Sequence, residues 1–433
     1  MGGILADIYI IIPFMFLLLS IALMPLLNKH FWERKYHWFS FISGVIVILY
    51  YLVFLNNFHR VIETFHEYFS FICLIGSLYI VTGGILIKFG NKGGPLVNST
   101  ILLIGSVLSN LIGTTGASML LIRPFIQINK ERLQGYLIVF FIFTVSNIGG
   151  ALTPIGDPPL FLGFLKGVPF FWVLEKNYHI WIMTISIIIT IFFIVDFYYY
   201  NQEKHYAPHK KNVEKNIDYL DDDLPIAIQI YGFSNVMLLS VIIVSVFWPS
   251  PYREIVMILS SIASMKITPQ KLRVKNEFNF EPVKEVAILF AGIFATMIPA
   301  LDWLSLNSKQ LGVSTAESYY WATGFLSSFL DNAPTYLNFF TIAVCSQVTE
   351  NPGLTAPNIQ SFIVANPKIL SAISMGAVFF GACTYIGNGP NFMVKSIAEQ
   401  SGIKMPDFIR YIVFYVFPFL LPTLTLVWYI HYK

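Results

Sequence analysis

Charge is scarce in this chain of 433 residues. Only 12% of the residues are Asp, Glu, Lys or Arg, whereas 56% are hydrophobic. This composition excludes an ordinary soluble globular domain. The three cysteines are odd in number and lie in or beside apolar stretches, so we expect packed thiols and no disulfide framework. The eight histidines lie near segment ends without ligand spacing, which argues against a zinc or haem site. We expect no nucleic-acid partner and no cofactor.

Long apolar runs fill most of the chain. A membrane-spanning helix needs about 20 mostly apolar residues, and the sequence supplies such runs at 8–27, 37–55, 69–89, 133–150, 180–200, 228–248, 286–304 and 408–429. The first run lacks a basic leader and a small-residue cleavage site, so we interpret it as a retained helix. The sequence therefore predicts an all-α polytopic membrane protein, with the lipid bilayer as its solvent.

The distribution of Lys and Arg predicts the orientation. Short loops rich in basic residues stay in the cytoplasm, and most of the 27 basic residues fall on one side when the N-terminus is placed outside. We therefore expect a multi-pass protein of the cell inner membrane with its N-terminus outside.

Two apolar segments are interrupted by polar residues at their middle. The first, at about 97–122, is broken by 109–116, and the second, at about 320–344, is broken by 331–335. Irregular backbone at membrane depth is tolerated only where it is buried in protein or lines a cavity. Each segment is therefore predicted to be a re-entrant helical hairpin, and the two enter from opposite sides, which is typical of an inverted repeat.

An internal match supports the repeat. Residues 150–161 (GALTPIGDPPLF) align without gaps with 381–392 (GACTYIGNGPNF), with seven of twelve positions identical. Asp157 faces its near-isostere Asn388. Gly and Pro in each copy end one helix before a short second one begins. Each repeat is therefore predicted to contain a discontinuous helix.

These features predict the organisation of the whole chain. We assign N-terminal scaffold helices to 1–66, repeat 1 to 67–200, a cytoplasmic linker to 201–225, further scaffold helices to 226–284, and repeat 2 to 285–433. The broken helices are placed at about 135–170 and 370–400.

Two acidic residues lie within predicted membrane segments, where an ionised side chain is unfavourable in free energy. A charged side chain in hydrocarbon costs several kcal/mol, and most acids of this chain are placed at loop ends, segment ends or in the linker. Asp157 and Asp331 are the exceptions, because they fall in the first broken helix and at the tip of the second hairpin. Inverted symmetry would bring them together near the midplane.

Oxygen-bearing side chains accompany the two carboxylates at the four chain breaks. Hard cations prefer oxygen ligands, and unwound backbone adds carbonyl groups. Burial disfavours an ionised carboxyl group, so such an Asp can exchange a proton for a cation. The candidate ion- or substrate-binding residues are Asp157, Asp331, Asn110, Thr114, Thr115, Asn147, Thr153, Asn332, Thr335, Thr384, Asn388 and Asn391, and the sodium-ligand candidates among them are Asp157, Asp331, Asn110 and Asn332.

No Lys or Arg is predicted at the centre to neutralise an organic anion. Lys166 and Lys395 follow the broken helices and are expected to extend toward a membrane interface. The lack of a central cation weakens the argument for an anionic substrate. It does not exclude one, because half-helix N-termini can themselves hold a carboxylate.

The segment 146–159 (SNIGGALTPIGDPP) resembles the signature loop of the ion transporter superfamily, in particular its NhaD-type sodium/proton antiporters and ArsB-type arsenite permeases. The second copy at 386–391 resembles the matching loop, and related chains are also described as citrate transporters. The resemblance implies a scaffold domain plus a transport domain of hairpins and broken helices, in a homodimer that moves by an elevator mechanism. It also implies ion-coupling roles for Asp157 and Asp331, with Asn110, Thr114, Asn332 and Thr335 at the hairpin tips.

Two departures from that pattern bear on the substrate. The first hairpin tip carries no acid, and the doubled Ser-Asn-Thr motifs of dicarboxylate carriers are absent. We therefore expect a sodium/proton antiporter in which Asp157 and Asp331 bind the ions alternately. The alternatives are a cation-coupled carrier of citrate or a dicarboxylate, and an arsenite-type efflux permease. An intramembrane aspartyl protease is disfavoured by the proline-rich loop around Asp157.

Overall fold

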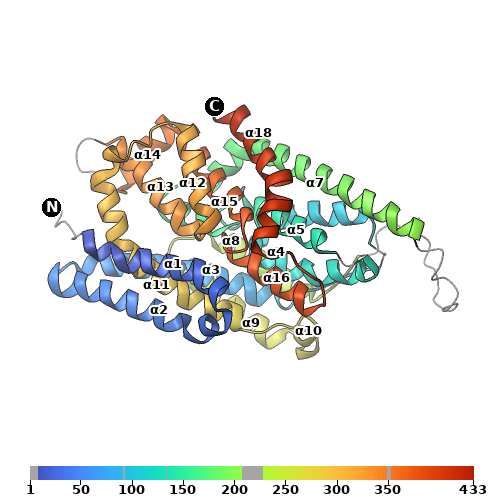
Figure 1. Ribbon diagram of the computed structural model, residues 1–433. Helices are drawn as coiled ribbons and strands as arrows, with labels where there is room; N and C mark the ends of the chain where they lie inside the picture. Colours follow the sequence, from blue (N-terminus) through green and yellow to red (C-terminus); the bar gives the residue numbers. More distant parts are fainter. Residues whose placement is uncertain (1–7, 91–92, 133, 207–227, 349–352) are drawn as a thin grey trace.

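The computed structural model confirms an all-α polytopic membrane protein (Figure 1). It describes residues 8–90, 93–132, 134–206, 228–348 and 353–433. Within these ranges seven helices are long and apolar enough to cross a membrane, or eight if the pair of helices bent by 97° at residue 366 counts as one span. Most of the predicted linker 201–225 lies outside the described residues.

The helices in the first half of the chain are α1 (Ile12–Leu27), α2 (Lys29–Leu49), α3 (Phe58–Thr82), α4 (Pro95–Ile128), α5 (Gly135–Thr144), α6 (Pro158–Leu165) and α7 (Trp172–Tyr206). The helices in the second half are α8 (Phe233–Ser245), α9 (Tyr252–Ile267), α10 (Gln270–Lys275), α11 (Glu281–Asn307), α12 (Ala316–Phe329), α13 (Asn332–Ser346), α14 (Ala356–Ala365), α15 (Pro367–Phe380), α16 (Gly389–Gln400), α17 (Phe408–Tyr411) and α18 (Leu421–His431).

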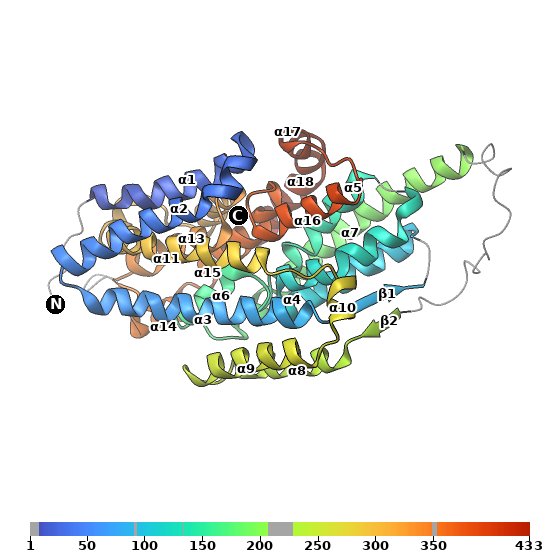
Figure 2. The ribbon, with the colours of Figure 1, turned by 90° about the horizontal axis from the view of Figure 1, so that it is seen from below.

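A short two-stranded sheet was not predicted. Strands β1 (Leu86–Phe89) and β2 (Ile228–Tyr231) pair antiparallel, with Leu86 opposite Tyr231 and Phe89 opposite Ile228. The strands follow α3 and precede α8, respectively (Figure 2). The sheet therefore ties together the ends of two segments that are far apart in the sequence.

Helix α4, which is one of the seven by length and composition, is a hairpin. Gly113 has φ +80° and ψ 152°, a backbone conformation that favours glycine, and the chain folds back there. The two ends of the hairpin meet, because Asn98 and Asn129 exchange side-chain hydrogen bonds of 3.0 and 2.9 Å. Helices α12 and α13 form the second hairpin and turn at Leu330 and Asp331.

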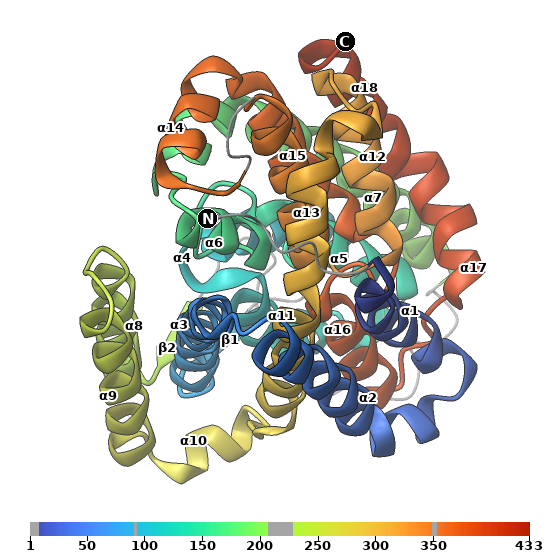
Figure 3. The ribbon, with the colours of Figure 1, turned by 90° about the vertical axis from the view of Figure 1, so that its left-hand side faces the viewer.

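The helices separate into two groups. Helices α1 and α2 pack on α11, and α8 and α9 pack on α3, while the Phe71 and Phe290 rings join α3 to α11 with centroids 4.6 Å apart. Figure 3 shows this layer along one side of the molecule, with α12, α13, α15 and α18 on the other side. We call α1–α3, α8, α9 and α11 the scaffold layer. We call α4–α7 and α12–α18 the core.

A buried ion pair fixes the open end of the first hairpin. Asp196 on α7 is fully buried and pairs with Arg132 at 2.6 Å, and it also accepts from Tyr136 and Asn98 at 2.7 and 2.8 Å. The sequence places Asp196 near the end of the apolar run 180–200 and gives no sign that it is buried. Donors from three separate elements satisfy this carboxylate inside the protein.

Breaking this network is expected to destabilise the fold. Removing one partner of a buried ion pair costs about 3–5 kcal/mol, so Asp196→Asn should lower the melting temperature of the purified protein substantially. The exposed pair between Arg123 and Glu277 offers a matched control, and Glu277→Gln should change stability by less than about 1 kcal/mol. Equal melting temperatures for the two variants would show that the buried network does not anchor the hairpin.

Candidate functional site

Two chain breaks at the centre of the core have the same internal geometry. The first lies between α5 and α6, and the second lies between α15 and α16. A Cβ atom on Gly156 would lie 2.1 Å from the carbonyl oxygen of Gly150, and one on Gly387 would lie 2.7 Å from that of Gly381. Each break therefore requires a glycine where two backbone segments touch.

Matching threonines attach each break to a hairpin tip. The Thr153 hydroxyl donates to the Asn110 carbonyl and accepts from the Gly156 N–H at 3.1 Å. The Thr384 hydroxyl donates to the Ser328 carbonyl and accepts from the Gly387 N–H at 3.1 Å. The internal match seen in the sequence is thus also a match in hydrogen bonding.

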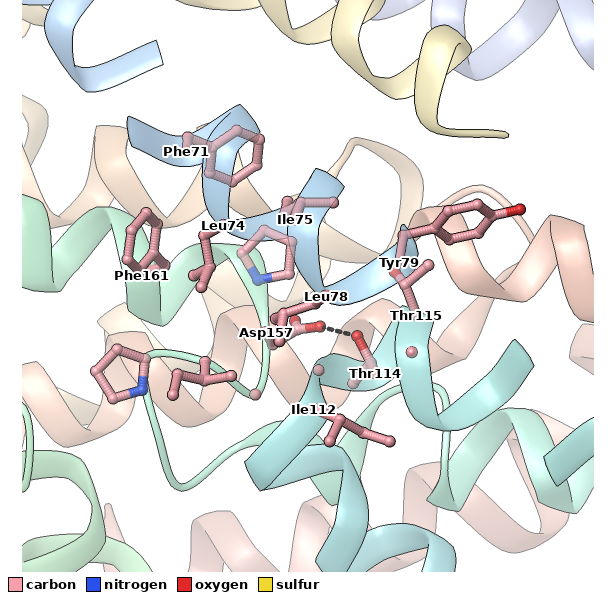
Figure 4. Close-up of a pocket in the computed structure, with 16 residues that line it drawn as sticks. Phe71, Leu74, Ile75, Leu78, Tyr79, Ile112, Thr114, Thr115, Asp157 and Phe161 are labelled. Carbon is pink, nitrogen blue, oxygen red and sulfur yellow. Dashed lines mark hydrogen bonds between the residues drawn. The ribbon is translucent and has the colours of Figure 1, made fainter. Parts of the chain in front are cut away.

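Asp157 lies where the two hairpin tips and the second break meet, and Figure 4 shows it beside Thr114 of the first tip. Its side chain is 1% exposed. Thr114 from the first tip and Asn388 from the second break donate to Oδ1 at 2.7 and 3.0 Å, and Asn332 from the second tip donates to Oδ2 at 2.5 Å. A single carboxylate therefore collects neutral donors from both halves of the chain.

Asp331 has a different environment. It precedes α13 as its N-cap, accepts from the Ala333 N–H at 3.0 Å, and is only partly buried. The Thr335 hydroxyl donates to the Asp331 carbonyl at 2.9 Å. Asp331 therefore stands at the second hairpin tip and makes no hydrogen bond with the Asp157 carboxyl group within the described part of the chain.

The amides of the site are held in fixed orientations. Asn110 accepts from the Leu152 N–H at 2.8 Å, and its Nδ2 donates to the Ser106 carbonyl at 3.3 Å. Asn147 donates to Asn391 at 2.7 Å. Asn110 therefore links the first hairpin to the first break, and Asn147 links that break to α16.

A small cavity opens beside Asp157. Its volume is about 30 Å³, and its lining comes from α3, the first hairpin tip and the first break. Figure 4 shows Leu78 of α3 on one side and Thr114 and Ile112 of the first hairpin on the other. A space of this size holds one or two waters or a small ion. The cavity lies between the scaffold layer and the core.

The two lysines near the breaks do not contact Asp157. Lys166 forms an ion pair with Glu67 of α3 and is 7% exposed, so its ammonium group is paired within the protein. Lys395 lies 4.6 Å from the centre of the Tyr385 ring and 3.7 Å from Glu399. Within the described ranges neither Asp157 nor Asp331 pairs with a lysine or arginine.

A further buried acid was missed by the sequence argument. Glu254 of α9 is 2% exposed, accepts from Ser70 of α3 at 2.5 Å and pairs with Arg253 at 2.6 Å. Glu254 lies in the scaffold layer. In the sequence, the neighbouring Arg253 was the one indication that its carboxylate has a partner. Among the described residues no group of three or more His, Cys, Asp or Glu side chains is placed to hold a metal ion, so a cation here would depend on amide and carbonyl oxygens.

A profile of the CitMHS_2 family, described as "Putative citrate transport", matches residues 5–432, which is nearly the whole chain. No curated protein matches the sequence significantly. The family match supports membrane transport and does not distinguish an antiporter of inorganic cations from a carrier of an organic anion.

Proposed function

This chain belongs to the citrate transport family, and from that premise we propose that it is a secondary active transporter that exchanges cytoplasmic sodium for external protons through Asp157. In this proposal Asp331 assists at the tip of the second hairpin. The protein acts as a transporter and not as an enzyme, and sodium and protons are its cargo.

The observation that carries the proposal is the environment of Asp157. Its carboxylate is buried where the two chain breaks and the two hairpin tips meet, and among the described residues its hydrogen-bond donors are the uncharged Thr114, Asn332 and Asn388. A buried carboxylate is stable when it binds a proton or is paired with a cation. Alternate occupancy by a proton and by sodium therefore provides the chemistry of exchange with one group.

The two-group architecture supports an elevator movement. The breaks and both hairpin tips belong to the core, and the hydroxyls of Thr153 and Thr384 bind each tip to its break. Charged contacts between core and scaffold layer occur at Lys166 with Glu67 and at Arg123 with Glu277. We propose that the core slides as a unit along α3 and α11 and exchanges these contacts, in a homodimer held together by the scaffold layers.

A cation-coupled carrier of citrate is the second candidate. The family description favours it, and so do the N-termini of α6, α13 and α16, which begin at the residues around Asp157. Helix N-termini carry partial positive charge that attracts carboxylates, although Pro158, Pro159 and Pro390 have no N–H group to donate. In this mechanism, cation binding at the same site would be coupled to uptake of the anion.

Transport by purified protein in proteoliposomes distinguishes these candidates. For the antiporter, a sodium gradient alone should drive proton movement, reported by an internal pH-sensitive dye, and citrate should have no effect. For the citrate carrier, labelled citrate should accumulate only with a sodium or proton gradient. Absence of sodium- or lithium-dependent proton movement between roughly pH 6 and 9, together with citrate uptake, would overturn the antiporter proposal.

A further inference from the structure

A short helical turn precedes each chain break, and no regular helix continues it. The two turns are 3-10 helices at Ile148–Gly150 and Gly381–Cys383. Carbonyl groups at the end of a helix have no partner within that helix, and water does not replace the partner in the interior of a membrane. Each turn therefore needs a hydrogen-bond donor from elsewhere in the protein.

An aromatic side chain supplies this donor in the first repeat. The indole N–H of Trp181 on α7 donates to the carbonyl groups of Ile148 and Gly149 at 2.9 and 3.1 Å. Trp181 is 8% exposed, so this shared hydrogen bond lies inside the core. Helix α7 directly follows α6. The donor therefore comes from the helix that follows the broken helix in the chain.

The second repeat has the same arrangement with a different residue. The Tyr411 hydroxyl on α17 donates to the Ala382 carbonyl at 2.8 Å, and Tyr411 is fully buried. Helix α17 follows α16 as α7 follows α6. The acceptors are not aligned positions, since Ala382 aligns with Ala151. The two repeats therefore share the role of the donor without sharing its residue type or its exact acceptor.

Each turn is connected to Asp157 through the glycine contact that shapes its break. Gly150 ends the first turn, and its carbonyl lies against Gly156, the residue before Asp157. The second turn makes the same contact with Gly387, the residue before Asn388. Asn388 donates to Oδ1 of Asp157 at 3.0 Å. A displaced turn would therefore move either the carboxylate or one of its donors.

We infer that Trp181 and Tyr411 are positioning residues, which hold the two breaks in place around the Asp157 carboxylate through the backbone carbonyl groups that they bind. Within the described ranges neither side chain donates to Asp157 itself. The effect of these residues on sodium rests on the proposed function, whereas their effect on the breaks does not. The two effects are therefore measured separately.

Hydrogen–deuterium exchange of the full-length protein in lipid nanodiscs measures the effect on the breaks without transport. Trp181→Phe should speed amide exchange in the peptide 145–161 about threefold to tenfold, because a buried hydrogen bond that holds this segment is lost. Tyr411→Phe should do the same for the peptide 379–392. Each variant should affect its own break much more than the other one.

Transport in proteoliposomes measures the effect on the ion site. Both variants should raise the sodium concentration for half-maximal proton movement about threefold to tenfold, while the rate at saturating sodium changes much less. A purely structural role would instead lower the amount of active protein. It would therefore reduce the maximal rate and leave the half-maximal sodium concentration unchanged.

Two matched controls make the same chemical changes away from the breaks. Trp172 lies on α7 with Trp181 and is 7% exposed, but among the described residues it donates to neither turn. Tyr320 is fully buried, and its hydroxyl donates to the Leu424 carbonyl at 3.1 Å. Trp172→Phe and Tyr320→Phe should leave both the exchange at the breaks and the sodium dependence unchanged.

The outcomes separate the positioning role from the antiporter proposal. Unchanged exchange at its own break in Trp181→Phe or Tyr411→Phe, or an equal change in the matched control, would overturn the positioning role. Faster exchange with an unchanged half-maximal sodium concentration would also overturn it, because the breaks would then move without disturbing Asp157. A wild type without sodium-dependent proton movement would overturn the antiporter proposal, and the exchange data alone would then decide the positioning role.

Discussion

Replacing Asp157 by asparagine is expected to abolish sodium-dependent proton movement while leaving the fold intact. Asparagine has nearly the same shape, already occupies the aligned position Asn388, and can still accept from Thr114 and Asn388 through its Oδ1. It carries no charge to pair with a cation and no proton to release. Removing one charge from a buried pair costs about 2–5 kcal/mol, so sodium affinity should fall by about thirtyfold or more and coupling should be lost entirely.

The measurement is dye-reported proton movement in proteoliposomes, with protein amount and melting temperature checked for each variant. Asp302→Asn is the matched control, because Asp302 lies on α11 and pairs with Arg60 at 3.0 Å, away from the breaks. It should retain transport. Sodium-dependent exchange by Asp157→Asn at the wild-type rate would rule out Asp157 as the coupling carboxylate.

Asp331→Asn completes the comparison. Asparagine is as good an N-cap as aspartate, so α13 should begin normally. Loss of activity in this variant would assign a role to the charge at the second hairpin tip, as the sequence predicts, and retained activity would limit the coupling to Asp157.

Gly156→Ala is expected to prevent correct folding of the first break. The added Cβ would lie 2.1 Å from the Gly150 carbonyl oxygen, and both backbone segments are held by other contacts, including the Thr114 N–H bond of 2.8 Å to the Gly156 carbonyl. Such an overlap costs about 3 kcal/mol or more. We expect loss of the monodisperse peak in size-exclusion chromatography or a large fall in melting temperature.

Gly389→Ala provides the matched control for this change. Gly389 begins α16 just after the second break, and a Cβ there would meet nothing within 4 Å. Its stability should stay within about 1 kcal/mol of the wild type. If both alanine variants behaved alike, the close approach of Gly156 to Gly150 would not be what shapes the break.

The sequence predicted the elements that depend on local pattern. Six of the eight long apolar runs correspond to spans, whereas 133–150 and 228–248 contain helices too short to cross a membrane alone. The Gly-rich interruption at 109–116 anticipated the fold-back at Gly113, because only a residue without Cβ readily adopts φ +80°. The internal match of 150–161 with 381–392 indicated equivalent breaks. In each case the cause lies in a few consecutive residues.

Features that depend on distant partners could not be predicted. Asp196 is buried because Asn98, Arg132 and Tyr136 surround it, and no sequence spacing reveals that arrangement. The pairing of Lys166 with Glu67 and the antiparallel strands β1 and β2 likewise join segments that are far apart in the chain. The sequence named Asp157 and its donors as candidates, whereas their shared contact with one carboxylate required the three-dimensional arrangement.

The two breaks differ at one decisive position, where Asp157 in the first is matched by Asn388 in the second. The pair therefore carries one unit of negative charge instead of two. A carboxylate that takes up one sodium ion and gives up one proton leaves the net charge of the moving body unchanged. Exchange through Asp157 alone would thus be electroneutral. It would be driven by the concentration differences of the two ions and would not depend on the voltage across the membrane.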